Sequence, residues 1–272
     1  MSLVRAGDLP QWYAVYPGIY GGYRAVMSPW EAAKSAFQWH NETLNIYTHL
    51  LVGLWALYKL YFIVGEPYYT ECSPECKYMI SSAWAGAGAL GLFSAFAHTF
   101  FIVDKDWFTG VWKLDFLGIV AVNFPHHLLD SFLITKALMG NRDMCLIAFT
   151  AETIFAGFVA YRIVACDLDV GRFWALAYPI VTSVPLTLPL YVYSRYGQSD
   201  ADFLAAAQAS VNCTLFIFIA GGLFFKGGIP ERFWNPRGIF DYFGSHTWHH
   251  IFIIASIMSA FSCTHLLQGL EA

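Results

Sequence analysis

Charged side chains are scarce in this sequence. Of its 272 residues only 12% are Asp, Glu, Lys or Arg, whereas 57% are hydrophobic and 18% are aromatic. Soluble globular domains carry about 25% charged residues, so the composition excludes an ordinary soluble protein. It indicates an integral, multi-pass membrane protein, because the apolar runs reach the length of about 20 residues that a helix needs to cross a bilayer.

Several other signals are absent as well. The 15 basic and 19 acidic side chains leave a net charge of −4, which gives no support to nucleic acid or another strongly charged molecule as a partner. We find no internal repeat, and no short segments of alternating polarity such as a transmembrane β-barrel requires. The first ten residues lack the apolar core of a secretory signal, so we expect the first membrane helix to direct insertion.

Cysteine is sparse, with six residues in the chain, and only Cys72 and Cys76 share a polar loop. Two cysteines alone do not make a zinc site. A disulfide between them requires that the loop face an oxidising compartment. The bridged and the reduced forms both stay open at this point.

Apolar runs divided by short polar turns fill most of the chain. Residues 1–41 are rich in aromatic, Pro and Gly residues, and we interpret them as a cap at the membrane surface with an interfacial helix near 29–40. Residues 42–272 are interpreted as one transmembrane domain. Seven helices are predicted there, at about 43–64, 78–103, 107–134, 144–164, 173–193, 203–225 and 244–267. The predicted fold class is an all-α membrane protein.

Lys and Arg divide unequally between the two ends of these helices. If the N-terminus is inside, ten of the 15 fall on the cytoplasmic side and five on the other. Cytoplasmic segments retain Lys and Arg. We therefore expect a cytoplasmic N-terminus and a C-terminus that is extracellular or lumenal.

Polar side chains gather at one depth of the predicted bundle. Ionisable residues within membrane spans are costly, so each is a candidate for function. Four segments carry such groups at the cytoplasmic end: Glu42, Asn45 and His49 in the first helix, Ser94 and His98 in the second, Lys113 and Asp115 in the third, and His246, His249 and His250 in the seventh. Their common depth predicts one polar site at the inner face.

These residue types suit zinc. Imidazoles are common zinc ligands, a carboxylate can bind the ion or hold its water, and serine or asparagine can orient the ligands. His246 and His250 lie one helical turn apart on one face, and His98 has the matching depth. His249 is also within one turn of His246, so spacing alone leaves His249 and His250 both open. Taken singly, each histidine is more simply a hydrogen-bonded packing residue.

Other polar residues lie too deep for this site. His126 and His127 follow Asp115 by 11 and 12 residues, which is about 17 Å along a helix. His265 lies deeper still. We expect these histidines to pack or to make polar contacts nearer the outer face. Two intramembrane carboxylates have no assigned role, Asp130 and Glu152.

Three motifs, in this order, resemble those of the adiponectin and progestin receptor family, which is related to haemolysin III. Residues 42–49 resemble the motif E-x-x-N-x-x-T-H. The second motif is Ser94-x-x-x-His98 followed by Lys113-Leu114-Asp115, and the third comprises Pro230-Glu231-Arg232-Phe233, Phe240-Asp241 and Ser245-His246-x-x-x-His250. The cap adds Leu9-Pro10-Gln11-Trp12 and Gly22-Tyr23-Arg24. In appearance the sequence is most similar to the adiponectin-receptor-like branch.

The resemblance implies a seven-helix protein with a zinc ion near the cytoplasmic face, held by His98, His246 and His250 with Asp115 close to the metal and its water. It thereby selects His250 over His249. Members of this family have been linked to ceramidase-type hydrolysis, which releases a fatty acid from an amide-linked lipid. Thr247 stands where a glutamine is common, so ligand and substrate preferences are not carried over.

Two functions are therefore expected as alternatives. In the first, zinc activates a water that attacks a ceramide-type lipid amide, Asp115 orients that water or accepts its proton, and Ser94 hydrogen-bonds a ligand or the intermediate. Glu42, Asn45 and His49 support the site. In the second, the zinc is structural and an extracellular ligand changes the helix arrangement of a signalling receptor. A channel or metal transporter fits least, since it needs polar residues along the whole depth of the bundle.

Overall fold

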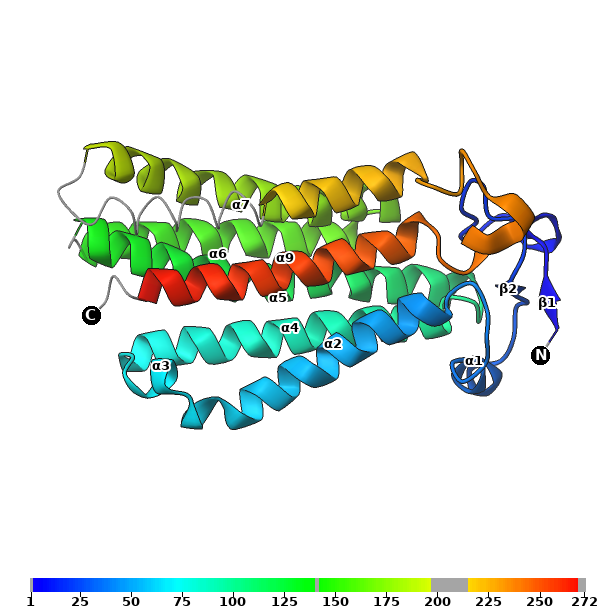
Figure 1. Cartoon of the computed structure of the whole chain (residues 1–272), viewed down its shortest axis with the longest axis horizontal. Helices are drawn as coiled ribbons and strands as arrows, with labels where there is room; N and C mark the ends of the chain where they lie inside the picture. Colours follow the sequence, from blue (N-terminus) through cyan, green and yellow to red (C-terminus); the bar gives the residue numbers. More distant parts are fainter. Residues whose placement is uncertain (1, 140–141, 197–214, 269–272) are drawn as a thin grey trace.

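The computed structural model shows a bundle of long helices with a folded N-terminal segment across one end (Figure 1). It describes residues 2–139, 142–196 and 215–268. The long helices are α2 (Thr43–Phe62), α4 (Pro74–Phe100), α5 (Lys105–Met139), α6 (Arg142–Ala165), α7 (Leu168–Tyr196) and α9 (Ser245–Gln268), together with the apolar helix Leu215–Gly227. The shorter elements are β1 (Leu3–Val4), η1 (Ala6–Asp8), β2 (Tyr23–Arg24), α1 (Pro29–Ser35), η2 (Ile63–Gly65), α3 (Pro67–Thr70) and η3 (Pro236–Asp241).

The predicted helical fold is confirmed. Helices occupy six of the seven predicted spans, and residues 215–225 of the sixth are helical, while 203–214 lie outside the described residues. Three described helices are long and apolar enough to cross a membrane, Thr43–Gly65, Pro74–Phe100 and Leu146–Ala165. The count of seven spans and their orientation stay predictions.

Small residues allow α2 and α4 to lie close together. A Cβ added to Gly91 would lie 2.5 Å from both Cα and N of Gly53, so the two backbones are in contact there. Close approach of this kind stabilises helix pairs in membranes, where van der Waals packing replaces the hydrophobic effect. The contact sets the start of α2 beside the end of α4.

A proline shapes the contact between α4 and α5. Pro125 lies inside α5 and has no N–H, so the carbonyl of Ala121 receives no helical hydrogen bond from it. A Cβ added to Gly86 of α4 would overlap that carbonyl oxygen. The glycine therefore allows α4 to pack directly against the backbone of α5.

The N-terminal segment, residues 2–41, is ordered and is called the cap here. Its strands β1 and β2 pair antiparallel, with Leu3 opposite Arg24. The helix predicted near 29–40 is present but ends at Ser35. Ser28 and Glu31 form a capping box at its start, and Pro29 occupies the first turn, where a missing N–H costs nothing.

Cys72 and Cys76 lie close together at the end of the bundle opposite the cap. Their Sγ atoms are 3.1 Å apart, which is longer than the covalent S–S bond of about 2.05 Å. The bridged and the reduced forms therefore both stay open.

Candidate metal centre

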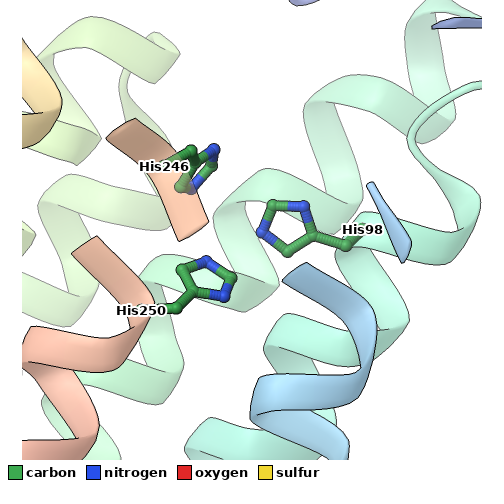
Figure 2. Close-up of side chains that lie close together, drawn as sticks. All are labelled: His98, His246 and His250. Atoms are coloured by element: carbon green, nitrogen blue, oxygen red, sulfur yellow. The ribbon is translucent and has the colours of Figure 1, made fainter. Parts of the chain in front are cut away.

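Three histidines from two helices meet at the cap end of the bundle (Figure 2). His98 lies in the last turn of α4, and His246 and His250 lie one turn apart at the start of α9. All three are buried, and one potential ligand atom from each lies within 4.8 Å of the others. Figure 2 shows the rings directed towards a common point. The arrangement can hold one metal ion.

The start of α9 is fixed by a carboxylate from the preceding loop. Glu231 accepts a hydrogen bond from the N–H of Ser245 at 2.8 Å and another from the Ser245 hydroxyl. A negative charge is favourable at the N-terminus of a helix, where backbone N–H groups lack partners. Because α9 starts at this residue, His246 falls in its first turn and His250 in the next.

Two of the imidazoles are oriented by side chains at the start of α2. One of these side chains directly precedes the helix and the other lies within it. Nδ1 of His98 lies 2.7 Å from Oε2 of Glu42. An ionised carboxylate only accepts hydrogen bonds, so His98 carries its proton on Nδ1. Nδ1 of His250 lies 3.2 Å from Oγ1 of Thr48. The Thr48 hydroxyl proton is directed to the backbone carbonyl of Leu44 at 2.8 Å, so its oxygen accepts from His250.

The third imidazole is oriented by the cap. Nδ1 of His246 lies 2.7 Å from the hydroxyl of Tyr16. Burial, with the charge of Glu42, raises the pKa of Tyr16 well above its usual range, so this hydroxyl stays protonated at neutral pH. Each of the three Nδ1 atoms therefore has a partner. When the proton of His246 is on Nδ1 and is donated to the Tyr16 oxygen, each of the three Nε2 atoms can act as a ligand.

The chemistry of this donor set fits a metal ion. Within the described residues, Nε2 of His98 is buried and has no hydrogen-bond partner. A buried nitrogen without a partner is unfavourable, and coordination of a metal would satisfy it. Hydrogen bonds to the second ring nitrogen are the usual way in which metal-binding histidines are fixed.

The residues predicted to support the site contact the three histidines or their partners. Asn45 donates from Nδ2 to Glu42 at 2.8 Å and accepts at Oδ1 from the hydroxyl of Thr247 at 2.7 Å. Thr247, which departs from the family motif, is therefore part of the same network. His49 stacks on His250 with ring centroids 3.8 Å apart.

The two residues predicted to be catalytic lie beside the histidines. Asp115 of α5 is close enough to His98 to interact electrostatically. The Ser94 hydroxyl is buried one turn before His98 on α4, without a hydrogen-bond partner among the described residues. Among the described residues, the ligand group contains the three histidines and not Asp115. Lys113, at the same predicted depth, instead donates to the carbonyl of Val164 at 2.7 Å.

His249 is separated from the ligand group. Its ring stacks on Phe225, with centroids 5.3 Å apart, and its centroid lies 6.3 Å from that of His246. Helical spacing had left His249 and His250 open as alternatives. The structure brings His250 into the group.

The deeper polar residues whose side chains the structure describes lie outside the group of three histidines. His127 stacks on Tyr178 with centroids 6.3 Å apart, and Tyr178 donates to Glu152 at 2.6 Å. His126 and Asp130 are buried on α5. The side chain of His265 lies outside the described residues.

Sequence reasoning missed two partners of the ligands, Tyr16 and Thr48, and the role of Arg24. The Arg24 guanidinium is fully buried and donates to the carbonyl oxygens of His98 and Thr99 and to the hydroxyl of Ser35. The motifs contain Thr48 and Arg24, but a motif alone does not say which atom each side chain contacts. Tyr16 lies in no recognised pattern.

Comparisons with known proteins agree with the sequence motifs. Membrane progestin receptor alpha of Homo sapiens is 25% identical over 244 residues, covering 88% of this chain and 69% of that protein. Membrane progestin receptor delta of Homo sapiens is 28% identical over 268 residues, covering 86% and 70%. Heptahelical transmembrane protein 3 of Arabidopsis thaliana is 24% identical over 307 residues, covering 94% and 85%.

A sequence model of the family described as Haemolysin-III related matches residues 37–261. The match includes the three histidines, Glu42 and Asp115. The predicted resemblance to the adiponectin and progestin receptor family and to haemolysin III is confirmed at the level of the family, and the closer similarity to the adiponectin-receptor-like branch stays a prediction. This chain is a multi-pass membrane protein that belongs to the haemolysin-III-related family.

Proposed function

We propose that this protein is a zinc-containing, receptor-like membrane protein that hydrolyses the amide bond of a ceramide-type lipid. One observation carries the proposal: three buried imidazoles share a potential metal position, and a carboxylate lies next to them outside the ligand group. Three histidines with an open fourth position are typical of catalytic zinc. A structural zinc site more often has four protein ligands.

His98, His246 and His250 would hold the ion, with Glu42, Thr48 and Tyr16 fixing their rings. When bound, zinc lowers the pKa of a coordinated water towards about 7 and polarises a carbonyl oxygen. This donor set, of neutral imidazoles only, favours zinc over magnesium or calcium, which prefer oxygen ligands.

Asp115 is proposed to orient the attacking water and to accept its proton. Attack on the amide carbonyl breaks the C–N bond and leaves a fatty acid and an amine, and the proton held by Asp115 passes to that amine. Ser94 is proposed to hydrogen-bond a ligand or the intermediate. The lipid would enter from the inner leaflet, because we place the N-terminus and the metal centre at the cytoplasmic face and the C-terminus on the other side of seven spans.

Purified protein tests this proposal by metal analysis and by release of fatty acid from ceramide in detergent micelles. Wild type should contain about one zinc per chain and hydrolyse the lipid. His250→Ala should lose the metal, and the matched control His249→Ala should keep it. Asp115→Asn should keep zinc and lose turnover.

Two results would overturn parts of the proposal. A zinc-loaded and fully active Asp115→Asn protein would remove the role assigned to this carboxylate. Loss of zinc from His249→Ala with retention in His250→Ala would overturn the ligand assignment.

A second function is a signalling receptor in which zinc is structural. The names of the progestin receptors among the relatives favour it, as does the cap that packs over the centre through Tyr16. In this case an extracellular ligand acts on the helix arrangement and no lipid is cut. Wild-type protein that contains zinc and releases no fatty acid would support this function over hydrolysis.

A further inference from the structure

The cap reaches the candidate metal centre through one side chain. The hydroxyl of Tyr16 is 2.7 Å from Nδ1 of His246, and the two rings meet edge to face with centroids 5.1 Å apart. The two residues are 230 positions apart in the chain. The contact therefore exists only while the cap is docked on the bundle.

His246 differs in this respect from the other two histidines. His98 and His250 are oriented by Glu42 and Thr48, which belong to the start of the membrane helix α2. These partners stay in place as long as α2 packs on α4 and α9. His246 is the one of the three whose Nδ1 partner comes from outside the bundle.

The segment that carries Tyr16 is hydrogen-bonded to the segment before α9. The N–H of Tyr16 donates to the hydroxyl of Tyr23 at 3.1 Å. Asp241 accepts from the N–H groups of Tyr20 at 3.2 Å and Gly21 at 3.0 Å. The position of the Tyr16 hydroxyl is therefore set by contacts that include the segment leading into α9.

A second contact fixes the cap to the helix that carries His98. Arg24 donates to the carbonyl oxygens of His98 and Thr99. The C-terminal end of a helix carries unpaired carbonyls and favours a cation. The cap thus contacts both helices that supply the three histidines. Arg24 of the cap binds the end of α4, and Tyr16 of the cap binds His246 of α9.

We propose that Tyr16 is a positioning residue for the metal centre, and that its hydroxyl couples docking of the cap to metal binding. This inference rests on the proposed zinc centre. Partners that orient metal-binding histidines typically change metal affinity by about 10- to 100-fold. Coupling between two binding events is reciprocal, so bound zinc must stabilise the docked cap by the same factor.

Full-length Tyr16→Phe protein tests the first half of the proposal. Zinc affinity is measured by competition with a chelator of known affinity. We expect about tenfold weaker binding in Tyr16→Phe. The matched control is Tyr20→Phe, because Tyr20 lies in the same segment and is 67% exposed. This variant should bind zinc as wild type does.

Hydrogen exchange of the cap amides tests whether bound zinc stabilises the docked cap, and it requires no assay of activity. Zinc should slow exchange in residues 2–41 of wild type and of Tyr20→Phe, and should slow it less in Tyr16→Phe. A merely structural role for Tyr16 would speed exchange equally with and without zinc. Tyr23→Phe provides a second variant, because it removes the acceptor of the Tyr16 N–H without touching an imidazole.

The outcomes separate this inference from the proposed function. If wild type binds zinc, and Tyr16→Phe and Tyr23→Phe bind it equally tightly with the same protection of the cap, the role of Tyr16 is wrong and the zinc centre stands. If wild type binds no zinc, the proposed function itself fails. Weaker zinc binding in Tyr16→Phe with reduced protection of the cap supports the coupling.

Discussion

The Glu42 carboxylate lies 2.7 Å from Nδ1 of His98, and the contact joins the start of α2 to the last turn of α4. Both side chains are almost completely buried. A carboxylate in this position fixes the orientation of the ring and raises the basicity of the opposite nitrogen. The pair therefore links helix packing to the geometry of the candidate metal centre.

Glu42→Gln should weaken zinc binding by about tenfold. The amide oxygen can still accept from His98, but it lacks the negative charge that strengthens the hydrogen bond. Chelator competition measures the change, and Glu66→Gln is the control because Glu66 is partly exposed and pairs only loosely with Lys59 at 3.6 Å. Unchanged affinity in Glu42→Gln would show that the carboxylate does not tune the site.

The closeness of α2 and α4 gives a second prediction. Gly91→Ala places a methyl group against the backbone of Gly53, so α2 must move and the unfolding temperature should fall by about 5–10 °C, which corresponds to a few kcal/mol. Gly157→Ala in α6 is the matched control, because no atom lies within 4 Å of its added Cβ. Thermal unfolding in detergent measures both. Equal unfolding temperatures would contradict the tight contact.

Burial of Arg24 gives a third prediction. Arg24→Met removes the donor for two carbonyl groups at the end of α4 and for Ser35, and leaving buried acceptors without a partner costs about 1–3 kcal/mol each. The unfolding temperature should fall by several degrees, and limited proteolysis should cut the cap sooner. Arg5→Met, in an exposed position of the same cap, is the control. Slower or equal cleavage of Arg24→Met would contradict the role assigned to Arg24.

The grouping of His98 with the histidines of α9 could be predicted from sequence because membrane helices impose a depth. Once the helix ends are placed, His98, His246 and Asp115 fall at the same level without any knowledge of side-chain contacts. Helical spacing could not separate His249 from His250, because both lie within one turn of His246. The two are distinguished by the packing of His249 on Phe225. That contact depends on the position of the helix Leu215–Gly227, which helical spacing does not give.

The contacts of the cap could not be predicted in the same way. Tyr16 lies in a segment without helical or strand periodicity, and its partner is 230 residues away. The strands β1 and β2 have two residues each, too short for an alternating pattern. The motif Gly22-Tyr23-Arg24 marked the right region, but burial of Arg24 against the carbonyl groups of α4 is a tertiary contact that no local pattern encodes.

The buried imidazole of His40, just before α2, gives a prediction about pH. Its Nε2 lies 3.1 Å from the carbonyl oxygen of Ser35, and its Nδ1 accepts from the N–H of Glu42 at 3.1 Å. Burial, followed by the charge of Arg24, lowers its pKa to about 3. In the unfolded chain its pKa is about 6.5.

Because the unfolded chain takes up this proton below about pH 6.5 and the folded protein does not, His40 lowers the free energy of unfolding as pH falls from 6.5 towards 3. Between pH 7.5 and 5.5 the loss amounts to about 1.4 kcal/mol. We expect the unfolding temperature of metal-free wild type to drop more over this interval than that of His40→Gln, which keeps a donor and an acceptor but does not titrate. The other histidines are the same in both proteins, so parallel pH profiles would show that His40 is protonated to the same extent in the folded and unfolded states.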